Sequence, residues 1–182
     1  MTNGKHIRNV QMIGNAGLMG LPKTAFLSSR KVAPQDVMRC YDWATGMRGG
    51  GGTPGGSAGR LAPPCVVGGF QSALERDVLK LLLPEGGPTI VMVLARGMWR
   101  SVPMEYREAI NAGRMLVVSP FSQGVVRVSK ETAERRNGWI LDHCDEIATR
   151  RSSRLSIQTV RSRVSSPPAR ISATRSFEGS LL

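Results

Sequence analysis

Histidine and cysteine are scarce in this chain, and their scarcity limits the metal chemistry open to it. The 182 residues include two histidines and three cysteines. Cys40, Cys65 and Cys144 are far apart and form no C-x-x-C pair, so a structural zinc site is not expected. An odd number of cysteines suits a reducing cytoplasm better than a disulfide scaffold. The composition therefore predicts no bound metal, and no motif calls for another cofactor.

A long apolar segment is also lacking. The longest strongly apolar run, Thr89 to Ala95, is far shorter than the roughly 20 residues that a membrane-spanning helix needs. Polar residues and glycines interrupt the apolar residues between positions 10 and 20, which makes a poor signal peptide. These absences predict a soluble, cytoplasmic protein with no membrane partner.

Acidic residues are about half as numerous as basic ones. Asp and Glu number 13 against 25 Lys and Arg, for a formal net charge of +12. The excess is uneven, because residues 149–182 hold seven Arg and one Glu. That segment is rich in Ser and Arg and has no apolar periodicity, so it is predicted to be disordered. The charge indicates a polyanionic partner mainly if this tail is functional.

Short apolar runs alternate with helical segments through most of the chain. Strands are expected at 24–27, 65–67, 89–95 and 115–119, and helices at 34–48, 73–83, 101–112 and 129–144. This alternation predicts an α/β fold, a Rossmann-like, doubly wound, mostly parallel sheet with helices on both faces. The expected domain occupies residues 22–148, after an N-terminal extension (1–21) and before the basic tail (149–182). Within it, residues 49–64 form a flexible Gly/Pro-rich insertion.

The clearest sign of a binding site lies between Cys65 and Leu83. A short apolar strand is followed by Gly68 and Gly69, and then by a helix in which Ser72 and Glu75 have the spacing of a capping box. Glycines let a ligand approach the backbone, and a helix N-terminus offers free N–H groups and a positive dipole end. The segment therefore predicts a phosphate site.

Polar residues that follow the neighbouring strands are expected at the same edge, because ligands of such sheets bind where parallel strands end. The predicted phosphate or nucleotide site comprises Ser28, Ser29, Arg30, Gly68, Gly69, Phe70, Ser72, Arg96, Gly97 and Ser119. A basic cluster at the start of the last helix is either a solvated surface or a track for DNA phosphates. The predicted DNA-binding residues are Arg30, Arg127, Lys130 and Arg136.

Five segments, in this order, resemble the family of DNA-processing protein A: SSRK (28–31), GGFQSALERDVL (68–79), VLARGMW (93–99), LVVSPF (116–121) and RVSKETAERRNGW (127–139). The likeness covers residues 22–148 and is greatest to short members that have only the Rossmann-like domain. They belong to a superfamily, SLOG, that includes lysine-decarboxylase-like phosphoribohydrolases. The resemblance implies a nucleotide or phosphate pocket, binding of single-stranded DNA, a homodimer and a recombinase partner in DNA uptake or recombination.

The sequence departs from the family pattern at several places. Ser28 replaces a glycine of the family's G-S-R turn, and Gly138 stands where the R-N-R motif has its second arginine. Beyond Ile147, where the family has another apolar strand, an Arg/Ser-rich segment follows. It is either the product of a frameshifted or truncated gene end or a genuine basic arm.

Two further functions stay open. One is an enzyme of the phosphoribohydrolase kind, in which Glu75 would take part in cleaving an N-glycosidic bond; otherwise no catalytic residue is predicted. The other is a nucleotide-sensing module that signals to a partner protein. The DNA-binding hypothesis is the leading one.

Overall fold

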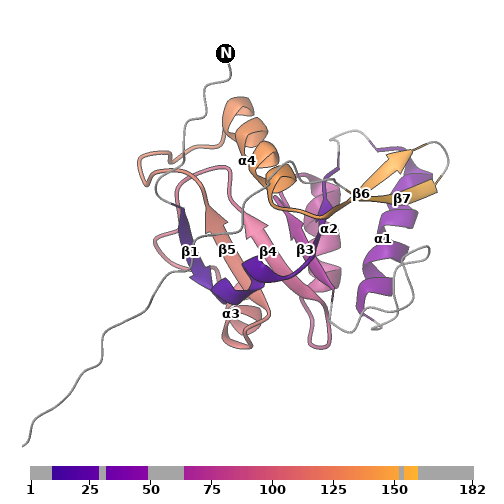
Figure 1. Cartoon of the computed structure of the whole chain (residues 1–182), viewed down its shortest axis with the longest axis horizontal. Helices are drawn as coiled ribbons and strands as arrows, with labels where there is room; N and C mark the ends of the chain where they lie inside the picture. Colours follow the sequence, from indigo (N-terminus) through magenta and orange to yellow (C-terminus); the bar gives the residue numbers. More distant parts are fainter. Residues whose placement is uncertain (1–9, 29–31, 49–63, 152–153, 160–182) are drawn as a thin grey trace, which may run out of the picture.

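The computed structural model describes residues 10–28, 32–48, 64–151 and 154–159, which build a seven-stranded sheet covered by helices (Figure 1). The strand order is β1-β5-β4-β3-β2-β6-β7. The central strands are mutually parallel: β2 (Lys23–Phe26), β3 (Cys65–Gly68), β4 (Thr89–Val93), β5 (Met115–Ser119) and β6 (Glu146–Arg151). The two edge strands, β1 (Gln11–Gly14) and β7 (Arg154–Thr159), are antiparallel to their neighbours.

Helices cover both faces of the sheet, as the sequence predicted. One face packs against α1 (Pro34–Arg48), α2 (Ala73–Leu82) and α3 (Met104–Asn111), and the other against α4 (Lys130–Asp142) and the 3-10 helix η1 (Ala16–Gly20). Alternate residues of each central strand therefore enter two separate cores. In β3, Val66 faces the first core while Cys65 and Val67 face the second, and all three are fully buried. This explains why the central strands are continuous apolar runs.

The order of the strands reverses at β2. From β2 the chain steps outward through β3, β4 and β5, and then returns to place β6 on the opposite side of β2. In open α/β sheets, ligands bind beyond the carboxyl ends of the strands, near such a reversal. The segments that follow β2 and β3 lie at the carboxyl ends of the parallel strands, the carboxyl edge of the sheet.

Helix and strand bounds agree closely with the expected ones wherever the local signal is strong. β5 and α1 have the expected bounds, and α2 begins after Ser72, whose capping box with Glu75 is formed. α3 begins later than expected, at Met104, because Pro103 occupies its N-cap position. None of the helices in the described ranges is long and apolar enough to cross a membrane.

The ends of the domain differ from the expectation. Residues 10–21, expected to be an extension, contribute β1 and η1 to the fold. At the other end, the sheet continues beyond Thr149 into β6 and β7, where the sequence suggested a tail without strands. Both edge strands are held by backbone pairing, which requires no apolar pattern. The remainder of that tail (160–182), the insertion (49–63) and residues 1–9 lie outside the described residues.

Candidate functional site

The turn after β3 is occupied by the ring of Phe70. This residue has a φ of 48°, a left-handed conformation that is rare for a bulky side chain. The buried ring lies against Gly68, where an added Cβ would come within 2.9 Å of the ring and 3.1 Å of the Phe26 carbonyl oxygen. Gly68 therefore makes room for the protein's own Phe70, and its contact with a ligand stays a prediction.

The adjacent glycine, Gly69, makes room for an arginine side chain. The guanidinium of Arg136, a residue of α4, lies where a Cβ of Gly69 would stand. Because α4 packs on the face opposite to α2, this side chain reaches over the carboxyl edge to the turn. Arg136 is only 4% exposed, so the first of the two alternatives for the basic cluster, a solvated surface, does not describe this residue. Tertiary packing thus brings a buried positive charge to the predicted phosphate site.

The electrostatic setting of Arg136 is unusual for a buried arginine. Burial lowers the pKa of its guanidinium, and the nearby Glu75 carboxylate acts in the opposite direction. Its Nε donates a hydrogen bond to Oδ1 of Asn137 at 2.8 Å. Among the described residues, the two terminal nitrogens have no hydrogen-bond acceptor and the guanidinium has no salt bridge within 4.0 Å. A guanidinium in that position has donors available for an anion.

Glu75 holds the two turns of the carboxyl edge together. Its Oε1 accepts a hydrogen bond from the Ser28 amide at 3.0 Å, and its Oε2 accepts from the amides of Gln71 and Ser72 at 2.8 and 3.1 Å. The Ser72 hydroxyl in turn accepts from the Glu75 amide at 3.1 Å. Both oxygens of this buried carboxylate are therefore engaged by the backbone, which gives Glu75 a structural role.

Several backbone donors remain beside Arg136. In the described part of the chain, no acceptor contacts the N–H groups of Gly69, Phe70 and Ala73, which stand at or just before the N-terminus of α2. The hydroxyls of Ser28 and Ser72 are 2.8 Å apart, so the ends of the two turns are in direct contact. The structure thus brings together Arg136 and five residues of the predicted phosphate site: Ser28, Gly68, Gly69, Phe70 and Ser72. Two others, Ser29 and Arg30, lie outside the described residues.

After β4 and β5, Ser119, Gly97 and the backbone of Arg96 make structural contacts. The fully buried Ser119 donates its hydroxyl to the Arg96 carbonyl at 2.7 Å and accepts from the Phe121 amide at 3.3 Å. The Gly97 amide donates to the Val125 carbonyl at 2.8 Å, and a Cβ on Gly97 would stand 2.6 Å from the Ser122 carbonyl oxygen. These contacts hold the loop 120–129 against the turn after β4, and they explain why these residue types occur there.

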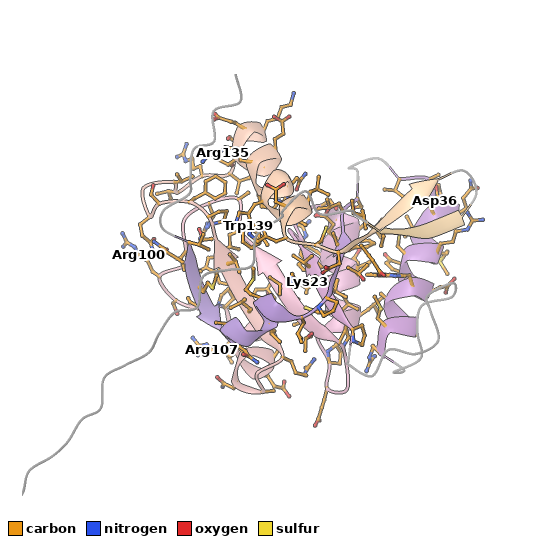
Figure 2. The ribbon with its side chains drawn as sticks, in the orientation of Figure 1. Lys23, Asp36, Arg100, Arg107, Arg135 and Trp139 are labelled. Atoms are coloured by element: carbon orange, nitrogen blue, oxygen red, sulfur yellow. The ribbon has the colours of Figure 1, made fainter. Side chains whose placement is uncertain are left out.

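The remaining basic residues are on the surface near the start of α4. Arg127 and Lys130 are exposed, and Lys130 forms a long surface ion pair with Glu134 at 3.9 Å. Arg135 places its guanidinium 5.1 Å from the centre of the Phe121 ring, and Figure 2 shows it on α4, far from Arg107 on the opposite side of the molecule. The basic cluster therefore divides into one buried arginine and a group of solvated ones.

Each tryptophan stacks on another ring of the protein. Trp43 packs on Phe26 and Trp139 on His143, with ring centres 5.0 and 3.9 Å apart, so both side chains contribute to packing. The ring centre of Trp99 lies 5.5 Å from that of Tyr106, which covers one of its faces.

Sequence reasoning missed a small cavity between α1 and α2. It has a volume of about 220 Å³, and Tyr41, Ser72 and Asp77 are among its lining residues. Its walls come from two helices, so no single stretch of sequence indicates it. No group of three or more potential ligand side chains in the described ranges is placed to hold a metal ion.

Comparison with known proteins identifies the fold. No protein-family model and no curated protein matches the sequence. The structure is similar to DNA processing protein A from Streptococcus pneumoniae, with a TM-score of 0.54 and 18% identity over 76% of this chain and 44% of that one. It is also similar to the Helicobacter pylori protein, with a TM-score of 0.55 and 15% identity over 77% of this chain and 59% of that one.

This likeness confirms that the chain has the Rossmann-like fold of DNA processing protein A, as the sequence resemblance implied. The chain spans about half the length of the two proteins that it matches. The H. pylori structure is described as showing a single-stranded DNA binding mode.

Proposed function

We propose that this chain binds single-stranded DNA at the carboxyl edge of its sheet, with one phosphate group held by Arg136 at the Gly69 turn. The observation that carries this proposal is the position of the Arg136 guanidinium. It is almost fully buried, it fills the space left by a missing Cβ, and its terminal nitrogens have no acceptor among the described residues.

The energetics favour a ligand for this arginine. Burying a charge costs several kcal/mol, and the cost is recovered only when good hydrogen bonds and an opposite charge are close. Glu75 supplies part of the opposite charge, but its oxygens accept hydrogen bonds from backbone amides. A phosphate oxygen between Arg136 and the amides of Gly69 and Phe70 would supply an acceptor that these donors lack among the described residues, and the N-terminal end of the α2 dipole would favour it.

The surrounding surface favours a nucleic acid over a free anion. Arg127, Lys130 and Arg135 follow β5 at the same edge and are exposed, so they can contact successive phosphates of a strand. The similarity in fold to a protein described as binding single-stranded DNA supports the same partner. Both oxygens of Glu75 accept hydrogen bonds from backbone amides, which does not favour phosphoribohydrolase chemistry.

The biological setting proposed for this binding is DNA uptake or recombination, with a homodimer and a recombinase as partners. It rests on the likeness to DNA processing protein A. Light scattering of the purified chain, alone and with DNA, tests the homodimer directly.

The binding test uses fluorescence anisotropy of a labelled oligo-dT strand. Arg136→Met should weaken binding at least tenfold and reduce the slope of log affinity against log salt by about 0.7, the value for one lost phosphate contact on a single strand. Arg107→Met is the matched control: it makes the same change in net charge at an exposed residue of α3, far from Arg135 (Figure 2). Unchanged affinity in a folded Arg136→Met variant, or an equal loss in the control, would refute the proposal.

A further inference from the structure

We infer that the cavity between α1 and α2 is a nucleobase subsite that prefers guanine. This inference rests on the proposed function, because the base in the cavity would belong to the strand whose phosphate Arg136 binds. The cavity lies beside the Gly69 turn, because Ser72 belongs to both. Ser72 lines the cavity, and its hydroxyl contacts that of Ser28 at the carboxyl edge.

The size of the cavity suits a single base. Its volume is about 220 Å³, which is below the roughly 300–1,000 Å³ of pockets that enclose a drug-sized ligand. Val37 and Leu74 form apolar walls, and Tyr41 adds an aromatic ring. Such walls are suited to the flat face of a base, whereas a whole nucleotide would extend beyond them toward the turn.

The polar group of the cavity selects for hydrogen-bond donors. Asp77 accepts a hydrogen bond from the Tyr41 hydroxyl at 3.4 Å on Oδ2 and one from Lys80 at 3.2 Å on Oδ1. Each carboxylate oxygen can accept a second bond, so both can still accept from a base. Among the described residues that line the cavity, Asp77 is the charged one, and a carboxylate favours a neutral base that donates hydrogen bonds over a phosphate.

Guanine fits this acceptor pair better than the other bases. Its N1–H and N2–H groups point in the same direction, so they can meet the two carboxylate oxygens at once. Adenine and cytosine present one amino group next to an acceptor nitrogen, and thymine presents one N–H between two carbonyl oxygens. A site built to accept hydrogen bonds rejects a ligand that lacks the matching donors.

The experiment compares two oligonucleotides, oligo-dT and the same strand with one central dG. Wild-type protein should bind the dG strand roughly five- to a hundredfold more tightly, as expected for a bidentate contact to a base. Asp77→Asn should abolish this preference while oligo-dT binding persists. The matched control is Asp42→Asn, which removes the same charge from an exposed residue of α1 that does not line the cavity.

The outcomes distinguish a failure of the guanine subsite from a failure of the proposed DNA binding. Equal binding of both strands by the wild type overturns the guanine subsite, while the proposed DNA binding stands. A dG preference that survives in Asp77→Asn, or that is lost equally in Asp42→Asn, also overturns the subsite. If neither strand binds, the proposed function fails and the subsite fails with it.

Discussion

The sharpest test of the site is the addition of one methyl group to Gly69. The Cβ of Gly69→Ala would overlap the guanidinium of Arg136, so that side chain must leave the turn. Gly69 does not have a positive φ, and the clash is with the far end of a flexible side chain. The backbone can therefore keep its conformation.

Loss of Arg136 from the turn should remove its contact with a phosphate. Hydrogen bonds that involve a charged group are worth about 1.5–3 kcal/mol, and 1.4 kcal/mol corresponds to about a tenfold change in affinity. Gly69→Ala should therefore weaken binding of single-stranded DNA about ten- to a hundredfold. Stability should change little, because a displaced guanidinium regains its hydration, and alanine restricts the unfolded chain by about 0.4–1 kcal/mol relative to glycine.

The assay pairs anisotropy titrations with urea unfolding of the same samples. Gly138→Ala is the matched control, because Gly138 lies in α4 near Arg136 and an added Cβ meets nothing within 4 Å. This substitution should raise the free energy of unfolding by up to about 1 kcal/mol and leave DNA affinity unchanged. Wild-type affinity in folded Gly69→Ala would show that the position of Arg136 does not matter for binding, which would refute the reasoning.

Three further predictions follow from the packing. Glu75→Ala should lower the free energy of unfolding by at least about 3 kcal/mol, because it leaves three backbone amides without their acceptor; a loss below about 1 kcal/mol in urea unfolding would contradict this. Cys40, Cys65 and Cys144 are buried and burial raises their thiol pKa values, so Ellman's reagent should react slowly with the native protein and quickly in denaturant. As the pH rises, the thiols lose their protons in the unfolded state before they do so in the folded state. The thiol contribution to stability should therefore be complete below pH of about 8.5 and decline above it. A free energy of unfolding that increases above this pH would contradict the prediction. Gly97→Ala should reduce thermal stability, because its Cβ would stand 2.6 Å from the Ser122 carbonyl oxygen. An unchanged melting temperature would contradict this, because it would mean that the loop moves away at no cost in stability.

Local patterns in the sequence were sufficient for the central architecture. The apolar run of β5 predicts its bounds because a strand buried on both faces tolerates few polar residues. The S-x-x-E spacing at Ser72 predicts the start of α2 because both capping hydrogen bonds form within four residues. These elements depend on neighbours in the chain, so one sequence is enough to find them. The edge strands β1 and β7 depend instead on backbone pairing with a distant partner, and they were missed.

Only the tertiary structure determines which side chains meet at the carboxyl edge. From the sequence, Gly69 indicated space for a ligand, and Arg136 belonged to a basic cluster that was either solvated or a track for DNA phosphates. Because α4 packs on the face of the sheet opposite to α2, the Arg136 side chain extends across the carboxyl edge and fills the space beside Gly69. In the same way, α1 and α2 must lie side by side before Tyr41 and Asp77 can share a cavity. The residue types are visible in the sequence, but which of them meet depends on contacts between elements far apart in the chain.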